Sequence, residues 1–234
     1  FEGLVLFGLL LCLYGFAKSR DSLAALGWSF AVAIKLTPLL IGPILLKAKH
    51  RQLIFWGISF TLIGISLFPL ILQENIGFWK SLSLYQKNFE FNASIYYLLN
   101  FPITVLIGYN PIGILGPILS LATLIFILMI CFWFPVSDSR TLAQGVVICY
   151  LVYLLMQPVV HPWYLIPAFG ISMLTPYRTF LVWTALVFLS YGAYSTYPAQ
   201  EKWYLLVLEY GILAIAVFHD WRRYQKGSAS VSKQ

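Results

Sequence analysis

The stretch Ala31-Val32-Ala33-Ile34-Lys35-Leu36-Thr37-Pro38-Leu39-Leu40 places one ammonium group inside one of the most apolar parts of the chain. A charged side chain at membrane depth is costly when it faces lipid, so Lys35 is expected to face a cavity lined by protein. Pro38 cannot donate a backbone hydrogen bond and clashes with the turn before it, which frees the carbonyl of Ile34 beside the ammonium. The stretch therefore predicts a broken, charged helix at membrane depth, and such a helix suggests a site.

The composition of the whole chain agrees with a membrane environment. Of its 234 residues 60% are hydrophobic and only 10% are charged, and the mean hydropathy is +0.83. These values predict a polytopic membrane protein without a soluble domain. The net charge of +7 comes from basic residues scattered at the ends of apolar runs, without a continuous stripe, so nucleic acid is not an expected partner. Cys12, Cys131 and Cys149 lie in apolar runs without Cys-x-x-Cys spacing and are expected to be packing residues.

The apolar runs predict the positions of the helices, since about 20 helical residues cross a hydrocarbon core of ~30 Å. The second run, 23–46, is broken at Lys35 to Pro38 and has basic residues at both ends. Basic loops favour the cytoplasmic side, so two half-length helices that turn back at the break, a re-entrant pair, are expected there. The other predicted helices cover 4–17, 53–72, 95–107 with an interruption at Asn100 to Pro102, 112–134, 142–156, 163–174, 180–194 and 203–218.

A long polar segment, 73–94, follows the third run. Apolar side chains recur in it at helical spacing, with polar ones elsewhere on the wheel, which predicts an amphipathic helix lying in the external membrane interface as the roof of a cavity. The apolar positions are Phe78, Leu82, Tyr85 and Phe89, and the polar ones are Lys80, Gln86, Lys87 and Glu90.

The predicted fold class is thus an all-α, polytopic transmembrane helix bundle with a re-entrant pair and an external interfacial helix. Residues 1–226 are expected to form the transmembrane domain, and 227–234 a disordered cytoplasmic tail. The chain begins without Met, a basic n-region or a cleavage site, so it is expected to be a fragment of a longer protein.

Polar residues from separate parts of the chain are expected to meet on the external side. Glu2, the segment 89–94 and His161-Pro162-Trp163-Tyr164 open to that face, and Lys35 points toward it from mid-membrane. This pattern favours a cavity that holds a lipid phosphate against Lys35, with a polar acceptor near the loops.

The order of these motifs resembles the GT-C superfamily of membrane glycosyltransferases, in particular bacterial mannosyltransferases that use polyprenol-phosphate-mannose. The motifs are Phe1-Glu2-Gly3, Lys35-Leu36-Thr37-Pro38 before a basic loop, Phe91-Asn92-Ala93-Ser94, and His161-Pro162-Trp163-Tyr164 ahead of Ser190-Tyr191. The resemblance implies a protein of the bacterial inner membrane. The apolar runs make it integral and multi-pass, and the basic residues of the loops and the tail predict a cytoplasmic C-terminus. The resemblance also implies transfer of a hexose, mannose above all, from a polyprenyl-phosphate donor to a glycan or glycolipid acceptor at the external face. Neither a metal nor another cofactor is expected, and membrane lipid is the remaining partner.

In such enzymes the catalytic base is an Asp in the first external loop, which would lie upstream of Phe1. No catalytic residue can therefore be assigned in this chain, and the chain alone is expected to be inactive. The residues expected to bind substrate are Glu2, Lys35, Asn92, Ser94, His161, Trp163 and Tyr164.

Each candidate also has a structural interpretation. Lys35 could be a polar plug that pairs with Glu209 or with freed carbonyls. Glu2 also suits a helix N-terminus, and His161 an interfacial hydrogen bond. Trp163 and Tyr164 could anchor the protein at the membrane interface or stack against a sugar. Asn92 and Ser94 could form hydrogen bonds inside the cavity or cap the helix that starts at Ile95.

Two other functions fit a broken, charged helix. A secondary transporter would carry a matching second broken helix, and no convincing partner for the Lys35 break is found, since Pro117 has no charge nearby. A non-catalytic scaffold of a membrane complex would tolerate substitution of Lys35 and His161.

Overall fold

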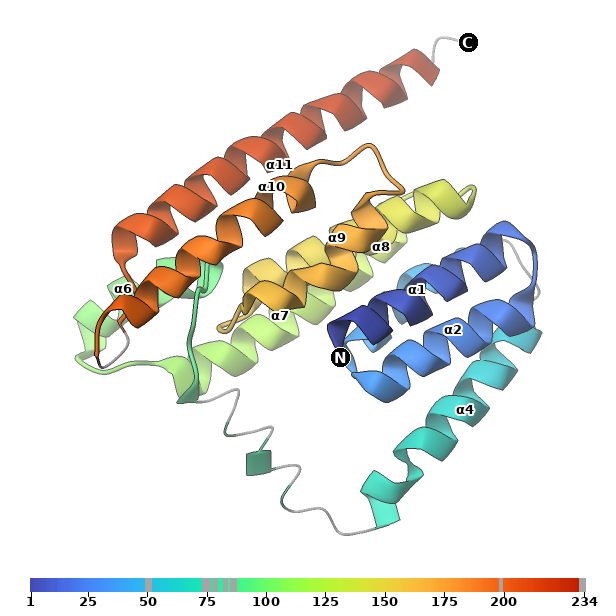
Figure 1. Ribbon diagram of the computed structural model, residues 1–234, viewed down its shortest axis with the longest axis horizontal. Helices are drawn as coiled ribbons and strands as arrows, with labels where there is room; N and C mark the ends of the chain where they lie inside the picture. Colours follow the sequence, from blue (N-terminus) through green and yellow to red (C-terminus); the bar gives the residue numbers. More distant parts are fainter. Residues whose placement is uncertain are drawn as a thin grey trace.

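The computed structural model describes residues 1–48, 52–72, 88–197 and 200–231, together with the single positions 77, 80, 81 and 84. In this part of the chain the regular elements are helices, arranged as an elongated bundle (Figure 1). The predicted all-α, polytopic class is confirmed. Half of the predicted interfacial helix in 73–94 lies outside the described residues.

Within the described residues, four helices are long and apolar enough to cross a membrane: α4 (Gln52–Leu72), α7 (Ile112–Trp133), α8 (Ser139–Met156) and α11 (Trp203–Val231). The shorter α-helices are α1 (Glu2–Ala17), α2 (Asp21–Ile34), α3 (Gly42–Leu45), α6 (Ile95–Ile107), α9 (Ile166–Ser172) and α10 (Thr179–Leu186). The 3₁₀ segments in the described part of the chain are η1 (Thr37–Ile41), η2 (Pro162–Leu165) and η3 (Val187–Ser195).

The predicted break after α2 is present. Lys35 has extended backbone angles, φ −156° and ψ 140°, and Pro38 lies in the first turn of η1, where its missing N–H is tolerated. The indole of Trp28 donates a hydrogen bond of 2.9 Å to the Pro38 carbonyl, and a Cβ added to Gly42 would lie 3.4 Å from the Trp28 ring. In one continuous helix, Trp28 and Gly42 would be about 21 Å apart. The chain therefore folds back along α2.

The returning segment brings α4 to the end of the bundle where α1 stops. The rings of Phe16 and Phe55 are 5.1 Å apart, and Lys47 Nζ donates to the carbonyls of Phe132 at 3.1 Å and Phe134 at 2.7 Å. The corner 18–20 and the segment 46–48 thus lie at the same end, as a re-entrant pair requires (Figure 1).

We call this the basic end, and the opposite one the site end. The basic end carries Lys18, Arg20, Lys47, Arg140, Arg178, Arg222 and Arg223. Asp220 joins α11 to the start of α10 there, since its Oδ2 accepts from the Arg178 and Thr179 amides, both at 2.8 Å. The site end carries Glu2, Lys35, Asn92 and His161.

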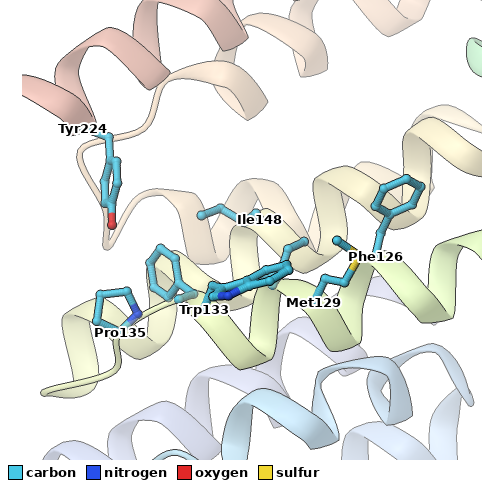
Figure 2. A pocket seen from close by; sticks show the side chains of 8 residues that line it. Phe126, Met129, Trp133, Pro135, Ile148 and Tyr224 are labelled. Atoms are coloured by element: carbon cyan, nitrogen blue, oxygen red, sulfur yellow. The ribbon is translucent and has the colours of Figure 1, made fainter.

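An apolar groove of ≈ 390 Å³ lies between the second half of α7, the middle of α8 and α11 (Figure 2). Phe134, Ile148 and Tyr224 line it and also line a neighbouring cavity of ≈ 300 Å³. Figure 2 shows the Tyr224 side chain extending from α11 toward the end of α7, where Trp133 ends the helix and Pro135 lies on the turn that follows. The walls of the groove are aromatic and aliphatic, unlike the polar site end.

Helices α1 and α2 pack with their backbones almost in contact. A Cβ added to Gly8 would lie 2.7 Å from the Gly27 carbonyl oxygen, and one added to Gly27 would lie 2.6 Å from the Gly8 oxygen. Only glycine permits this approach. Cys12, also between these helices, is buried, and so are Cys131 and Cys149, all as free thiols.

The clearest differences from the sequence expectation are an interruption that is absent and a helix that ends later. Helix α6 runs without interruption through Asn100 and Pro102, because a helix keeps its other hydrogen bonds when a proline removes one. Helix α11 continues to Val231, past the predicted start of the tail at Gly227, because adding a residue to an existing helix is easier than starting one. The predicted domain boundary itself stays a prediction.

Candidate functional site

Lys35 forms an ion pair with Glu2 at the site end. The ammonium bonds to Glu2 Oε1, and the Lys35 side chain is 28% exposed while that of Glu2 is 9% exposed. Glu2 belongs to the first turn of α1, where the helix dipole favours a carboxylate. Helix α2 has 14 residues and is about 21 Å long, so a span starting at one membrane surface places Lys35 about two-thirds of the way across a core of ~30 Å.

Aromatic side chains from η2 cover the ammonium. Lys35 Nζ lies 4.0 Å from the centroid of the Tyr164 ring, within the range of a cation–π contact. The rings of His161 and Trp163 stack at 4.5 Å, and Trp163 is 45% exposed. Pro162 starts η2 and fixes the turn that presents these rings. The structure thus brings five predicted residues together: Glu2, Lys35, His161, Trp163 and Tyr164.

His161 lies in a setting that favours the neutral imidazole. Burial lowers the pKa of His161 below its ordinary value, and the positive charge of Lys35 lowers it further. A neutral imidazole has one donor and one acceptor nitrogen, so it can bond to a phosphate oxygen or to a hydroxyl group.

Asn92 and Ser94 lie behind this group, and both are hydrogen-bonded to other parts of the protein. Phe91 bridges to Val159 and contacts the His161 ring at 5.0 Å. The next residue, Asn92, is fully buried and has a left-handed backbone with φ 48°. The Ser94 hydroxyl donates to the Leu155 carbonyl at 2.8 Å, although Ser94 stands at the N-cap of α6. The capping position is confirmed, but the hydroxyl does not cap the helix.

Two carboxylates hold this loop. Glu201 accepts hydrogen bonds from the backbone N–H of Asn92 at 2.6 Å and from the Tyr97 hydroxyl. Burial raises the pKa of Glu201 above its ordinary value. Glu209 accepts from the Asn92 side chain at 3.1 Å and from the Trp183 indole at 2.9 Å. Glu209 therefore binds Asn92, whereas Lys35 binds Glu2.

Sequence reasoning missed these anchors as parts of the site. Glu209 could have been found from the sequence, because it is the one acidic residue in the apolar run 203–218. Lys35 was found in the same way, as the one basic residue in the run 23–46. Glu201 could not have been found in this way, since it lies in an ordinary polar connection.

The assembled side chains suit an anion more than a metal ion. A partly exposed ammonium, an aromatic face and a neutral imidazole provide positive charge and hydrogen bonds at one place. Within the described part of the chain, no cluster of three or more His, Cys, Asp or Glu could hold a metal.

Comparison with known proteins identifies the family. The profile of GT87, glycosyltransferase family 87, matches residues 1–158, more than half of the chain. The chain belongs to glycosyltransferase family 87. With its membrane-length helices, this family-87 chain is an integral membrane glycosyltransferase. The matched region includes Glu2, Lys35, Asn92 and Ser94 and ends before His161. No curated protein and no solved structure matches the chain.

Proposed function

We propose that this family-87 protein transfers a hexose, mannose being the expected sugar, from a polyprenyl-phosphate donor to a glycan or glycolipid acceptor. The observation that carries the proposal is the Lys35 ammonium, held part-way across the membrane beside Glu2, Tyr164 and His161. A lipid-linked phosphate is an anion that reaches this depth on its own hydrocarbon chain. The transporter and scaffold alternatives gain no such support, because the family is one of glycosyltransferases.

The chemistry divides between the two ends of the reacting bond. The acceptor oxygen forms a bond to the anomeric carbon, while the bond from that carbon to the phosphate oxygen breaks and leaves its electron pair on the phosphate. A base takes the proton of the acceptor hydroxyl, and the GT-C resemblance implies an Asp in this role. Lys35 stabilises the charge that develops on the departing phosphate, and the His161 imidazole donates a hydrogen bond to it.

Glu2 acts as the counter-ion of Lys35 before the donor arrives. An unpaired ammonium at this depth would be costly, so the Glu2 carboxylate stabilises the empty site. The Lys35 side chain keeps 28% exposure, which leaves room for a phosphate oxygen to approach the same ammonium.

We place the site end at the external face. Most of the described basic residues lie at the opposite end, and basic loops favour the cytoplasm. This orientation makes the C-terminus cytoplasmic and opens the site to acceptors outside the cell.

A pair of variants separates a phosphate site from a structural plug. Lys35→Met leaves Glu2 buried without its partner, so we expect both a lower unfolding temperature and a loss of transfer of roughly 100-fold or more. Glu2→Gln/Lys35→Met removes both charges together, so we expect the unfolding temperature to recover while transfer stays lost. Membranes from cells that express the complete gene, with any sequence before Phe1, are assayed with labelled polyprenyl-phosphate mannose, and unfolding is followed in detergent.

Lys18→Met is the matched control, because Lys18 is an exposed lysine at the basic end that lies over the Tyr14 ring. It is expected to change neither quantity. Recovery of transfer in the double variant would show that Lys35 is a plug and would overturn the proposal. Glucose, galactose and arabinose donors, compared in the same assay, decide the sugar.

A further inference from the structure

The side chain of Glu209 has an uneven set of partners. Glu209 and Asn92 are both 0% exposed. Glu209 Oε1 accepts two hydrogen bonds, from Asn92 Nδ2 at 3.1 Å and from Trp183 Nε1 at 2.9 Å. Glu209 Oε2 and Asn92 Oδ1 have no hydrogen-bond partner among the described residues. Two buried acceptors on neighbouring groups therefore lack a donor.

This pattern is that of a neutral carboxylic acid. An ionised carboxylate spreads its charge over both oxygens and, when buried, needs donors or a cation at each of them. A neutral acid has one carbonyl oxygen, which accepts, and one hydroxyl oxygen, which donates. The two bonds on Oε1 and the bare Oε2 match these roles.

The charged groups around Glu209 also disfavour an ionised form. Glu201 faces the same Asn92 from the connection before α11, and Tyr97 on α6 donates to Glu201. The Tyr210 hydroxyl on α11 donates to the backbone carbonyl of Asn92. Lys202 lines the same small space as Glu209, but no ion pair joins them among the described residues. A second negative charge beside Glu201 would be without compensation.

The space beside the pair admits little else. It measures ≈ 10 Å³ and is lined by Asn92, Ser190, Glu201 and Glu209, among others, which is about the room that one water needs. A hydrated cation is too large for it. Turning the Asn92 amide over would not help, because its oxygen would then face Glu209 Oε1.

We propose that Glu209 is protonated in the folded protein and that its Oε2–H group donates to Asn92 Oδ1. With the bond from Asn92 Nδ2 to Glu209 Oε1, acid and amide then form a ring closed by two hydrogen bonds. Every polar atom of both side chains is satisfied by this arrangement except one amide hydrogen, and no buried charge remains.

The ring makes Glu209 a positioning residue for the site. It fixes Asn92 in its left-handed conformation, φ 48°, and Asn92 follows Phe91, whose ring contacts His161 at 5.0 Å. Glu209 lies outside the region that matches the family profile, residues 1–158. The last third of the chain would thus hold the loop against the site; this consequence for catalysis rests on the proposed function.

Infrared spectroscopy tests the protonation directly. Membranes containing the protein at pH 7 are expected to show the carbonyl stretching band of a protonated carboxylic acid, shifted in D₂O and absent from Glu209→Gln. Glu90→Gln, which changes a carboxylate exposed at the same end, is the control and should keep the band. Absence of the band, or its persistence in Glu209→Gln, would overturn the proposal.

Stability supplies the second measurement. Glutamine can replace both hydrogen bonds of the ring without a proton. Glu209→Gln should therefore unfold near the wild-type temperature at pH 4, where Glu209 is largely protonated in the unfolded chain as well, and above it at pH 7, where the folded wild type must keep a proton that the unfolded chain releases. Glu209→Ala should unfold at a lower temperature at both. A Gln variant as unstable as the Ala variant contradicts the ring. In transfer assays Glu209→Ala should raise the KM for the donor, and Glu209→Gln should have the KM of the wild type. If the wild type transfers no hexose, the proposed function fails while the infrared result still stands.

Discussion

Lys35 and Lys47 are both partly buried lysines near the ends of short helices, yet their ammonium groups are satisfied in different ways. Lys47 bonds to two backbone carbonyls, of Phe132 and Phe134, and so completes the end of α7. Lys35 pairs with the movable carboxylate of Glu2. A carboxylate can give way to an incoming anion, whereas a carbonyl of a helix end cannot, so only Lys35 is placed to exchange partners.

The coupling between Lys35 and His161 gives a prediction at the same scale. Lys35→Met removes one of the two causes that lower the pKa of His161, so that pKa should rise toward its ordinary value of 6.5. Folding disfavours the protonated imidazole, so the stability that neutral His161 contributes is present above pH 6.5 and decreases as the pH falls toward the lowered pKa. In Lys35→Met the folded-state pKa of His161 lies closer to 6.5, so this loss of stability should be smaller and should occur over a narrower pH range.

The measurement is NMR titration of histidine-labelled protein in detergent. The chain has three histidines, and His161→Asn identifies the resonance of interest. Lys18→Met, far from the site end, should leave it unchanged. An unaltered His161 titration in Lys35→Met would mean that the charge does not reach the ring.

At the scale of helices, the glycine contact between α1 and α2 should be intolerant of a single methyl group. Gly27→Ala pushes a Cβ into the Gly8 carbonyl, and we expect a loss of about 1–3 kcal/mol. Gly64→Ala on α4 is the matched control, because no atom lies within 4 Å of the new Cβ; it should gain up to about 1 kcal/mol from helix propensity. Unfolding of both variants in detergent with added denaturant gives the comparison. Equal effects would argue against the close α1–α2 contact.

The elements differ in how far the sequence predicts them. The break at Lys35 and Pro38 is local, and it is where the sequence places it, as are the long helices that follow from apolar runs. The partner of Lys35 is not local: Glu2 and Glu209 are both carboxylates in apolar runs, and only the packing of α1 on α2 chooses Glu2. The loop anchors were hidden for the same reason, since Asn92 and Glu209 are 117 residues apart.

At the scale of the whole molecule, the two ends of the bundle should be distinguishable from opposite sides of the membrane. Ser19 and Leu46 lie at the basic end, and Tyr109 and Tyr197 at the site end, with all four exposed. Single cysteines at these positions, with Cys12, Cys131 and Cys149 replaced by alanine, are treated with a membrane-impermeant maleimide. Ser19→Cys and Leu46→Cys should react from the cytoplasmic side only, and Tyr109→Cys and Tyr197→Cys from outside only.

The first pair carries the test of the re-entrant fold. If the segment from Asp21 to Leu45 crossed the bilayer, Ser19→Cys and Leu46→Cys would react from opposite sides. Orientation is tested separately by which side each pair faces, and reversal of both pairs would place the site in the cytoplasm.

The short length of α1 and α2 has a consequence for the lipid around them. With 16 and 14 residues, they measure about 24 and 21 Å, less than a hydrocarbon core of ~30 Å. Hydrophobic mismatch of this kind thins the bilayer or draws headgroups inward beside the helices. In a thin membrane the donor phosphate would have the shortest distance to move from the membrane surface to Lys35. Reconstituted in lipids of decreasing acyl-chain length, the enzyme should turn over its donor faster, so bilayer thickness becomes a control variable of the reaction.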